Sequence, residues 1–314
     1  MSEIKTAIMC IAKMENLYIR DFVEYYHRLG FTHIFIYDNN DVNGEQFTDV
    51  IADYIHDGYV TILNVRGVRG TFYIDDNMYQ LQESAYTHCY YQLCNDYDWV
   101  MAVDIDEFLT FTDENMTIDK YLLKNEFQKC DVIYVNWLNY GDSGKIYREP
   151  NIPVYERLTQ PIAADNRTWE NAMSILGCNQ YEYDNQTIKS IVRTRKQIKY
   201  INSHIVQSMT DDELCAMNTA GIILPQSAII EYGVLQLDYC DFSCAYLRHY
   251  VTKTIQEWME SKMQRGFPDA YNNCYYTKYP TSFFRHGNEW TIEKQEFIDK
   301  FMYENYVKKD GTKN

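Results

Sequence analysis

The pattern of apolar and polar positions predicts alternating strands and helices along the N-terminal third of the chain. Apolar strands are indicated at 4–11, 33–37 and 59–63, and segments with apolar positions at helical spacing separate them. Gly30 and Gly58 stand where the two helices would end. This β-α-β-α-β order is typical of a doubly wound parallel sheet with right-handed crossovers, so we predict an α/β fold.

The same two periodicities predict the remaining elements, although the signals are less regular farther along the chain. A long helix is indicated at 77–94, and the apolar strand 99–103 follows it. Residues 145–186 are predicted to be irregular, and 211–233 are ambiguous. The other expected elements are a helix at 118–127, strands at 132–137, 187–194, 198–205 and 234–239, and helices at 246–265 and 291–306.

Three carboxylates follow the buried strand in the run WVMAVDIDEFLTF, which spans 99–111. On a continuing strand Asp104 and Asp106 would share one face, roughly 7 Å apart, and Glu107 comes next. Carboxylates at the carboxyl end of a buried strand repel one another unless a divalent cation lies near them. Ligands of open α/β sheets bind at this edge. The motif therefore predicts a metal-assisted site, and a solvated, inert acidic loop is the alternative.

Composition and the absence of common motifs narrow the function. The net charge of −16 argues against a nucleic-acid backbone as the partner, because phosphate binding needs a basic surface. The chain shows neither GxGxxG nor GxxxxGK[ST], so it is predicted to have neither a dinucleotide site of that type nor a P-loop.

Location is predicted from the cysteines and from the length of the apolar runs. The nine cysteines form no CxxC pair and are expected to be reduced thiols of a cytoplasmic protein. The start MSEIKTAIMCIAKMEN does not look like a signal peptide, and no stretch approaches the roughly 20 apolar residues of a membrane span. At most peripheral membrane contact is expected.

Several stretches of the chain resemble one group of glycosyltransferases. AIMCIAKMENLYIRDFVEYYHRLGFTHIFIYDNND and WVMAVDIDEF resemble the opening of the family 2-like GT-A enzymes, close to family 92 and the former domain of unknown function 23. NWLNYGDSG, KSIVR with His204 following, and RHYVTKTIQEWMESKMQRG are similar to three later motifs of that group, in the same order. The resemblance covers about 6–266. Thr254, Thr194 and Asp142 depart from the usual residues, which leaves acceptor details open.

The resemblance implies a GT-A fold, with a Rossmann-like, mixed but mostly parallel sheet flanked by helices and a smaller C-terminal acceptor-side region. We expect a nucleotide-sugar-binding half at 1–111, an acceptor-side half of the same domain at 112–290, and a C-terminal helix and tail at 291–314. The implied activity is metal-dependent, inverting transfer of a hexose from a nucleotide-sugar donor, with a UDP-hexose as the family-level expectation. The implied acceptor is a glycan or lipid-linked oligosaccharide, used in surface polysaccharide or oligosaccharide synthesis in the cytoplasm or at the inner face of the membrane.

The resemblance also implies a divalent cation, Mn²⁺ or Mg²⁺, held by the DxD motif. Asp106 is the first choice as a metal ligand, and Asp104 is expected to meet the metal, a metal-bound water or the ribose. GT-A enzymes often supply a third ligand from a C-terminal histidine, for which His204 and His249 are equal candidates. A lone histidine in an apolar strand is more often a core residue, so that reading stays open for both.

The candidates for the donor site and for the general base are less specific. The base is expected to be a carboxylate, and spacing does not separate Asp142 in its glycine-flanked loop from Asp165 and Asp241. Candidate nucleotide-sugar-binding residues, besides Asp104, are Ala12, Glu15, Asp38, Lys189, Arg193 and Lys253.

Each donor-site candidate has a structural alternative. Asp38 could form an Asx turn, and Glu15 could be a first-turn helix charge. Lys189 and Arg193 alternate along one expected strand, and they face either a phosphate or solvent. Lys253 follows His249 by four residues, so the two would share one face of the expected helix.

Two other functions compete with glycosyl transfer. A nucleotidyltransferase such as a sugar-nucleotide pyrophosphorylase would need a glycine-rich loop after the first strand, whereas residues 12–16 read AKMEN. A non-catalytic carbohydrate-binding protein would not need carboxylates at the end of a buried strand. Loss of nucleotide-sugar hydrolysis on chelation would distinguish a metal-dependent glycosyltransferase from a carbohydrate-binding protein.

Overall fold

The computed structural model describes residues 4–68, 71–74, 77–162, 185–194, 196, 198–208, 214–230, 233–265 and 288–307 of the chain. It divides into two compact units. Unit 1 comprises Met1–Leu138 and Glu182–His249, and unit 2 comprises Asn139–Tyr181 and Tyr250–Asn314. The chain therefore passes between the units three times. The proposed halves at 1–111 and 112–290 stay a prediction.

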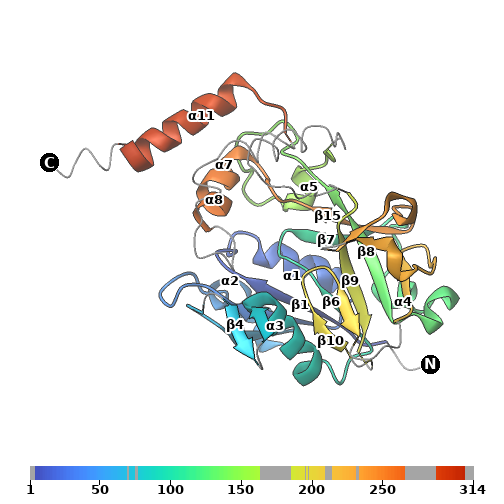
Figure 1. Cartoon of the computed structure of the whole chain (residues 1–314). Coiled ribbons are helices and arrows are strands. Elements are labelled where there is room, and N and C mark those ends of the chain that lie inside the picture. Colours follow the sequence, from blue (N-terminus) through green and yellow to red (C-terminus); the bar gives the residue numbers. More distant parts are fainter. Residues whose placement is uncertain are drawn as a thin grey trace. The chain divides into compact units, whose positions relative to one another are not determined.

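Unit 1 is built on one sheet, which has nine strands among the described residues. The strands are β1 Thr6–Ala12, β2 His33–Asp38, β3 Val60–Asn64, β6 Trp99–Ala102, β7 Glu107–Phe111, β8 Val132–Asn139, β9 Ile188–Arg193, β12 Ala216–Asn218 and β15 Ala245–His249. Their order is β3-β2-β1-β6-β9-β8-β15-β7, and β12 pairs with β8. Figure 1 shows β1, β6 and β9 side by side in this sheet.

The sheet is mixed, with its N-terminal strands parallel as predicted. Strands β3, β2, β1 and β6 are parallel to one another. Strand β9 is antiparallel to both β6 and β8, and β15 is antiparallel to β7. The antiparallel insertion of β9 brings a distant stretch of sequence against the end of β6, where the acidic motif begins.

Helices cover both faces of the sheet. The helices of unit 1 are α1 Ile19–Arg28, α2 Thr48–His56, α3 Leu81–His88 and α4 Ile118–Leu122, with a π-helical turn at Cys89–Leu93 and 3₁₀ turns at Asn125–Lys129, Gln226–Ala228 and Leu237–Tyr239. Helix α1 packs into one apolar core and α3 into the other. Three hairpins complete the unit: β4 Thr71–Ile74 with β5 Asn77–Gln80, β10 Ile198–Ile201 with β11 Val206–Ser208, and β13 Ile229–Ile230 with β14 Val234–Leu235.

Helix α1 forms as the sequence predicts and fixes the strand beside the acidic motif. Its predicted apolar stripe is buried, and Gly30 ends it at φ 92°. The Tyr26 hydroxyl donates to the carbonyl of Glu107 at 3.0 Å and accepts from the amide of Leu109 at 3.1 Å. A buried side chain of the helix thereby holds the start of β7.

Unit 2 contains short helices around a small apolar core. Its described helices are α5 Val154–Arg157, α7 Ile255–Glu257, α8 Met263–Arg265 and α11 Ile292–Met302, with π-helical turns at Trp258–Lys262 and Tyr303–Val307. Thr291 caps α11 as predicted, since its side chain accepts from the amide of Lys294. Arg157 and Glu257 form a buried ion pair, with Nη1 2.8 Å from Oε2.

Two predicted elements are shorter than expected, because local hairpins replace their ends. The predicted helix at 77–94 begins as a strand, since residues 77–80 pair with 71–74; the helix starts at Leu81 and continues as a π-helical turn. The predicted strand at 198–205 is a hairpin. There the side chain of Asn202 accepts the amides of His204 and Ile205 at 2.7 Å and makes the turn.

The predicted helix at 246–265 is wrong in its first half. Residues 245–249 are strand β15, which pairs with β7 so that His249 stands opposite Glu107. The helix begins only at Ile255, where the Thr254 side chain caps it. His249 and Lys253 therefore do not share a helix face. No helix within the described part of the chain is long and apolar enough to cross a membrane.

Candidate active site

The acidic motif forms a turn rather than a continuing strand. We call Asp104–Glu107, between β6 and β7, the acidic turn. The amide of Glu107 donates to the carbonyl of Asp104 at 3.0 Å, and the amide of Asp104 donates to the Glu107 side chain at 2.9 Å. The expected strand alternation of Asp104 and Asp106 is therefore wrong, because these reciprocal bonds close a turn. The carboxylates still lie where predicted, after the buried strand β6.

A buried lysine compensates the charge of the acidic turn. Lys189 on β9 is fully buried, with Nζ 2.8 Å from Oδ2 of Asp104 and 3.3 Å from Oε1 of Glu107. Gln82 on α3 donates to the other oxygen of Asp104 at 3.1 Å. Burial lowers the pKa of Lys189, but the carboxylates of Asp104 and Glu107 outweigh burial and raise it. Lys189 therefore holds Asp104 in place, rather than standing on a solvated strand edge.

On one face of the sheet, three neighbouring strands change from apolar residues to side chains that carry polar groups. Val135 on β8, Ile191 on β9 and Leu247 on β15 belong to the same apolar core. Side chains two positions apart on a strand share a face. On that face the next residues are Trp137 after Val135, Lys189 before Ile191 and His249 after Leu247. The fold thus gathers side chains from three distant stretches beside the acidic turn.

Trp137 lies between two histidines, and we call His204, Trp137 and His249 the aromatic column. The Trp137 and His249 rings are tilted by 35° with centroids 4.0 Å apart, and the His204 ring stands edge-on at 5.4 Å. Nε2 of His249 is 4.0 Å from Oδ1 of Asp106. Both candidate histidines are therefore brought to the acidic turn.

The tautomer of His204 is set by the backbone. Its Nδ1 is 2.9 Å from the carbonyl oxygen of Ile188, which can only accept, so Nδ1 carries the proton and Nε2 carries a lone pair. Burial, together with the charge of Lys189, lowers the pKa of His204 to about 4. The imidazole is neutral at physiological pH.

The chemistry of these side chains fits a divalent cation, although no complete ligand set is preassembled. No group of three His, Cys, Asp or Glu side chains is gathered for a metal ion among the described residues. Asp106 and His249 have ligand atoms 4.0 Å apart. Two ligands of one octahedral cation, each about 2.1 Å from it, lie roughly 3–4 Å apart. These two residues could hold Mn²⁺ or Mg²⁺ together.

Asp38 is engaged at both of its carboxylate oxygens. Nη1 of Arg66 lies 2.7 Å from one oxygen, and the backbone and side-chain nitrogens of Asn40 donate to the other at 3.0 and 2.8 Å. The Asx-turn alternative is therefore what the structure shows. A contact of Asp38 with the ribose stays a prediction.

Ala12 and Glu15 lie in the loop after β1, which is joined to the loop after β2. Ala12 is buried and its carbonyl accepts from the amide of Asn39 at 2.9 Å. The amide of Met14 donates to the Asn40 side chain at 2.7 Å. Glu15 is also buried, and its carbonyl accepts the amides at the start of α1. Their roles in donor binding stay predictions.

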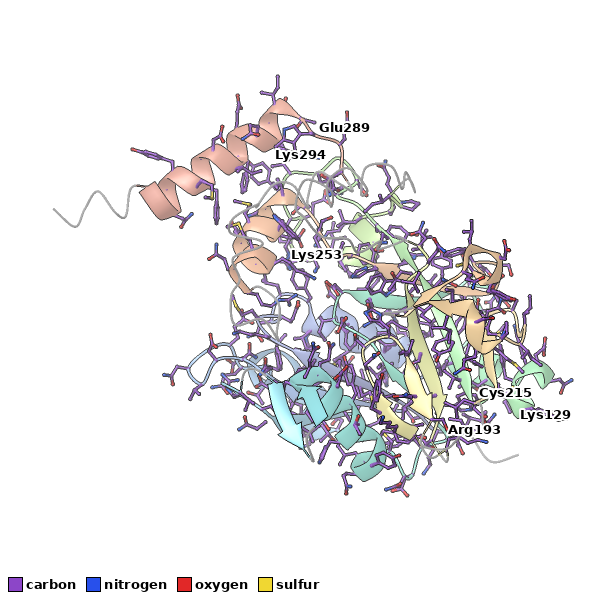
Figure 2. The ribbon with its side chains drawn as sticks, viewed as in Figure 1. Lys129, Arg193, Cys215, Lys253, Glu289 and Lys294 are labelled. Atoms are coloured by element: carbon purple, nitrogen blue, oxygen red, sulfur yellow. The ribbon has the colours of Figure 1, made fainter. Side chains whose placement is uncertain are left out.

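Arg193 does not face the candidate site. It lies opposite Trp99, at the start of β6, and its guanidinium donates to the carbonyls of Phe127 and Cys130 at 2.9 Å. Figure 2 shows it beside Lys129 and Cys215, away from the carboxyl end of β6. Lys189 and Arg193 stand near opposite ends of β9, about 13 Å apart at four residues of strand rise, so they cannot contact the same phosphate group. A contact of either one with a phosphate stays a prediction.

The candidate bases differ in their surroundings. Asp142 in unit 2 is buried and paired with Lys294, and burial raises its pKa despite the lysine. For Asp241 in unit 1, partial burial is outweighed by hydrogen bonds from Thr219 and Ser243, which lower its pKa. Asp165 lies outside the described residues.

Lys253 belongs to unit 2, together with the Asp142–Lys294 pair. It is buried in a left-handed backbone conformation, with φ 54°, and its charge helps to lower the pKa of Glu257. Figure 2 labels Lys253 and also shows Lys294 next to Glu289, whose carbonyl accepts from Lys294. A contact of Lys253 with a diphosphate stays a prediction. It is no longer supported by a shared helix face with His249, because residues 245–249 form a strand.

Sequence reasoning missed Gln82 and Trp137. Gln82 was not recognised because its partner Asp104 is distant in sequence and only packing joins them. Trp137 had a detectable signal: it ends the apolar alternation of β8 on the same face as Val135.

Comparisons with known proteins identify a family. The sequence profile described as "Glycosyltransferase family 92" matches residues 5–286. A comparison with curated proteins gives no match. Among solved structures the chain is similar to "Crystal structure of S. aureus TarS 1-349", at 12% sequence identity and a TM-score of 0.31, over 61% of this chain and 47% of that one. The matched part is thus about half the length of that structure.

Proposed function

The chain belongs to glycosyltransferase family 92, and on that premise we propose that it moves a hexose from a nucleotide sugar to a hydroxyl group of a glycan. One observation carries the proposal: the parallel strands β3, β2, β1 and β6 lead to the acidic turn at the carboxyl end of β6. This edge of an open sheet is where ligands bind. We infer a GT-A fold and a UDP-hexose donor from the family assignment and this arrangement.

We propose that Asp106 and His249 hold Mn²⁺ or Mg²⁺. A cation there would neutralise the charge that develops on the departing diphosphate. Asp104 is held by Gln82 and Lys189, and this supports a role in orienting the ribose or a metal-bound water. The buried charge of Lys189 lies against Asp104 and Glu107 and supports the positions of these two side chains.

Transfer with inversion needs a carboxylate that takes the proton of the acceptor hydroxyl. The buried ion pair with Lys294 supports a structural role for Asp142. Asp241 lies in unit 1, and hydrogen bonds from Thr219 and Ser243 outweigh its partial burial and lower its pKa. We therefore propose Asp241 ahead of Asp142, with Asp165 as the third candidate.

We propose a glycan or lipid-linked oligosaccharide as the acceptor, in cytoplasmic or membrane-associated synthesis of a surface polysaccharide. The negative net charge supports a partner other than nucleic acid. The described cysteines are free thiols, as expected in a reducing compartment.

The test is a hydrolysis screen of UDP-, GDP- and dTDP-sugars in Mn²⁺, with and without a chelator. We expect one nucleotide sugar to be hydrolysed, and chelation to abolish the reaction. Asp106→Asn should lower the rate at least about 100-fold and weaken Mn²⁺ binding measured by calorimetry, because it removes a ligand charge. Asp57→Asn, at an exposed position, is the matched control. Hydrolysis that survives chelation would refute metal dependence, and absence of any reaction or binding would refute the donor class.

A further inference from the structure

The indole nitrogen of Trp137 is a buried hydrogen-bond donor without a partner. Native proteins leave few buried polar atoms unpaired, because each one has given up its hydrogen bonds to water. Trp137 is only half-buried as a residue, whereas its Nε1 is covered. A donor kept in this state beside an acidic turn points to a ligand that supplies the missing acceptor.

The indole is held in one orientation by its neighbours. His249 stacks on it at a centroid distance of 4.0 Å, and His204 packs edge-on at 5.4 Å. The ammonium of Lys189 lies 5.9 Å from the ring centroid. Rotation of Trp137 into solvent would break these contacts, so the N–H is fixed.

His204 supplies a complementary group on the ring that packs edge-on against Trp137. Its Nδ1–H is used by the carbonyl of Ile188, which leaves the lone pair of Nε2 as an acceptor. Nε2 has no hydrogen-bond partner within the described part of the chain. The backbone of Gly233 packs so closely that an added Cβ would lie 2.3 Å from Cβ of His204. The position of the imidazole is therefore as fixed as that of the indole.

One donor beside one acceptor matches a hydroxyl group rather than a phosphate. A hydroxyl both accepts and donates a hydrogen bond, whereas a phosphate oxygen that is ionised only accepts. The carboxylates of Asp104 and Asp106 lie close to the column and disfavour a bare anion. Sugars carry hydroxyl groups and apolar C–H faces, and an aromatic column can contact both.

We propose that Trp137 and His204 bind one hydroxyl group of the transferred sugar, with Trp137 Nε1–H as the donor and His204 Nε2 as the acceptor. This inference rests on the proposed function, because it assigns the hydroxyl to the nucleotide-sugar donor. The column stands beside the acidic turn, where the sugar–phosphate bond would be cleaved. Trp137 and His204 then determine which sugars the enzyme accepts, while the nucleotide is bound elsewhere.

The experiment separates the affinity for the sugar from the affinity for the nucleotide. Calorimetry in Mn²⁺ measures the dissociation constants of UDP, GDP, dTDP and their glucose, galactose, mannose and N-acetylglucosamine conjugates. For the best-bound nucleotide sugar, the ratio of the constant of its free nucleotide to its own constant is the sugar contribution. Trp137→Phe and His204→Phe keep an aromatic ring and remove the proposed donor and acceptor, and His204→Phe also removes the bond from Nδ1–H to the carbonyl of Ile188.

We expect each variant to lower the sugar contribution about three- to tenfold, as for one net hydrogen bond. Binding of the free nucleotide and of Mn²⁺ should be unchanged. His204→Gln should restore part of the loss, because its amide oxygen can accept. Trp99→Phe, which changes a buried indole at the other end of the same sheet, should leave the sugar contribution at the wild-type value.

Three results would overturn the proposal, and they differ from one another. An unchanged sugar contribution in both Phe variants would remove the hydroxyl site and leave the enzyme's function intact. A loss of Mn²⁺ or free-nucleotide affinity in His204→Phe would make His204 a metal ligand instead. If no nucleotide sugar in the panel binds the wild type, the proposed function itself fails and this inference fails with it. If Trp137→Phe does not fold, the sugar contributions of His204→Phe and His204→Gln decide whether the hydroxyl site exists.

Discussion

Lys294→Met should destabilise unit 2 in a way that depends on pH. Lys294 and Asp142 are almost fully buried, and their side chains form an ion pair that ties α11 to the loop after β8. The loop is also held by Asn288, whose side chain accepts from the amide of Asp142 at 2.5 Å. Methionine keeps the length of the lysine stem and removes its charge.

The size of the effect follows from what Asp142 can do without its partner. Leaving one charge of a buried pair unpaired costs about 3–5 kcal/mol. The folded protein can instead protonate Asp142. For a carboxyl with an ordinary pKa of about 3.9, protonation at pH 7 costs about 4 kcal/mol, at 1.36 kcal/mol per pH unit. We therefore expect a loss of about 3–4 kcal/mol at pH 7.

The sign of the pH dependence is set by the raised pKa of Asp142. Burial already raises this pKa in the wild type, and removal of Lys294 should raise it further. A folded carboxyl with a raised pKa loses stability as pH rises from its unfolded pKa to its folded pKa. The difference in free energy of unfolding between wild type and variant should therefore increase towards neutral pH. At pH 5 it should fall to about 1.5 kcal/mol.

The assay is urea unfolding followed by tryptophan fluorescence at pH 5, 6, 7 and 8. Lys300→Met, at an exposed position of the same helix, is the matched control and should change little. The double variant Asp142→Asn with Lys294→Met should recover most of the loss, because no charge stays buried. A loss that does not vary with pH, or one below about 0.5 kcal/mol, would refute the assignment of a buried ion pair.

Three further predictions concern the scaffold of the site. Arg193→Met should lower the melting temperature and leave nucleotide affinity unchanged, because its guanidinium bonds backbone carbonyls; a several-fold loss of affinity would contradict this. Arg66→Met should speed amide hydrogen exchange at residues 41–45, because Arg66 donates to the carbonyls of Asp41, Gly44 and Glu45, and equal exchange rates would show that the loop keeps its own shape. Gly233→Ala should cost at least about 1 kcal/mol in thermal unfolding, because φ is 78° and His204 leaves no room; an unaltered melting temperature would argue against that packing.

The N-terminal third of the fold was predictable because its signals are local. Ile19, Phe22, Val23 and Tyr26 form a stripe at helical spacing, and all four are buried in α1. Gly30 then ends the helix with a backbone conformation that side chains disfavour. Each of these elements carries its own start, face and stop within a few residues.

The segment around β15 was not predictable in the same way. Ala245–His249 is too short for periodicity to distinguish a strand from a helix, and the helix after Thr254 suggested a helix for the whole run. Pairing with β7, more than a hundred residues earlier, decides its conformation. Such pairing leaves no mark in the local pattern.

In the candidate site, too, local signals were predictable and long-range contacts were not. The spacing of Asp104 and Asp106 after an apolar strand located the acidic turn from sequence alone. The contact of Asp104 with Lys189 was not predicted, because Lys189 is 85 residues away in the sequence and reaches Asp104 through the antiparallel insertion of β9. Charge and spacing thus predicted where the carboxylates gather, whereas strand order determines which groups meet there.

The insertion of β9 beside β6 also affects how the sheet can form during synthesis on the ribosome. Strand β6 is interior in the finished sheet, between β1 and β9, but β9 is made roughly 90 residues later. At about 5–20 residues per second, the nascent chain exposes the edge of β6 for roughly 5–20 s. During that time the four parallel strands present an unpaired, apolar edge, which is a template for pairing with other chains. The order of the strands therefore makes the newly made N-terminal third dependent on rapid translation or on protection by other proteins.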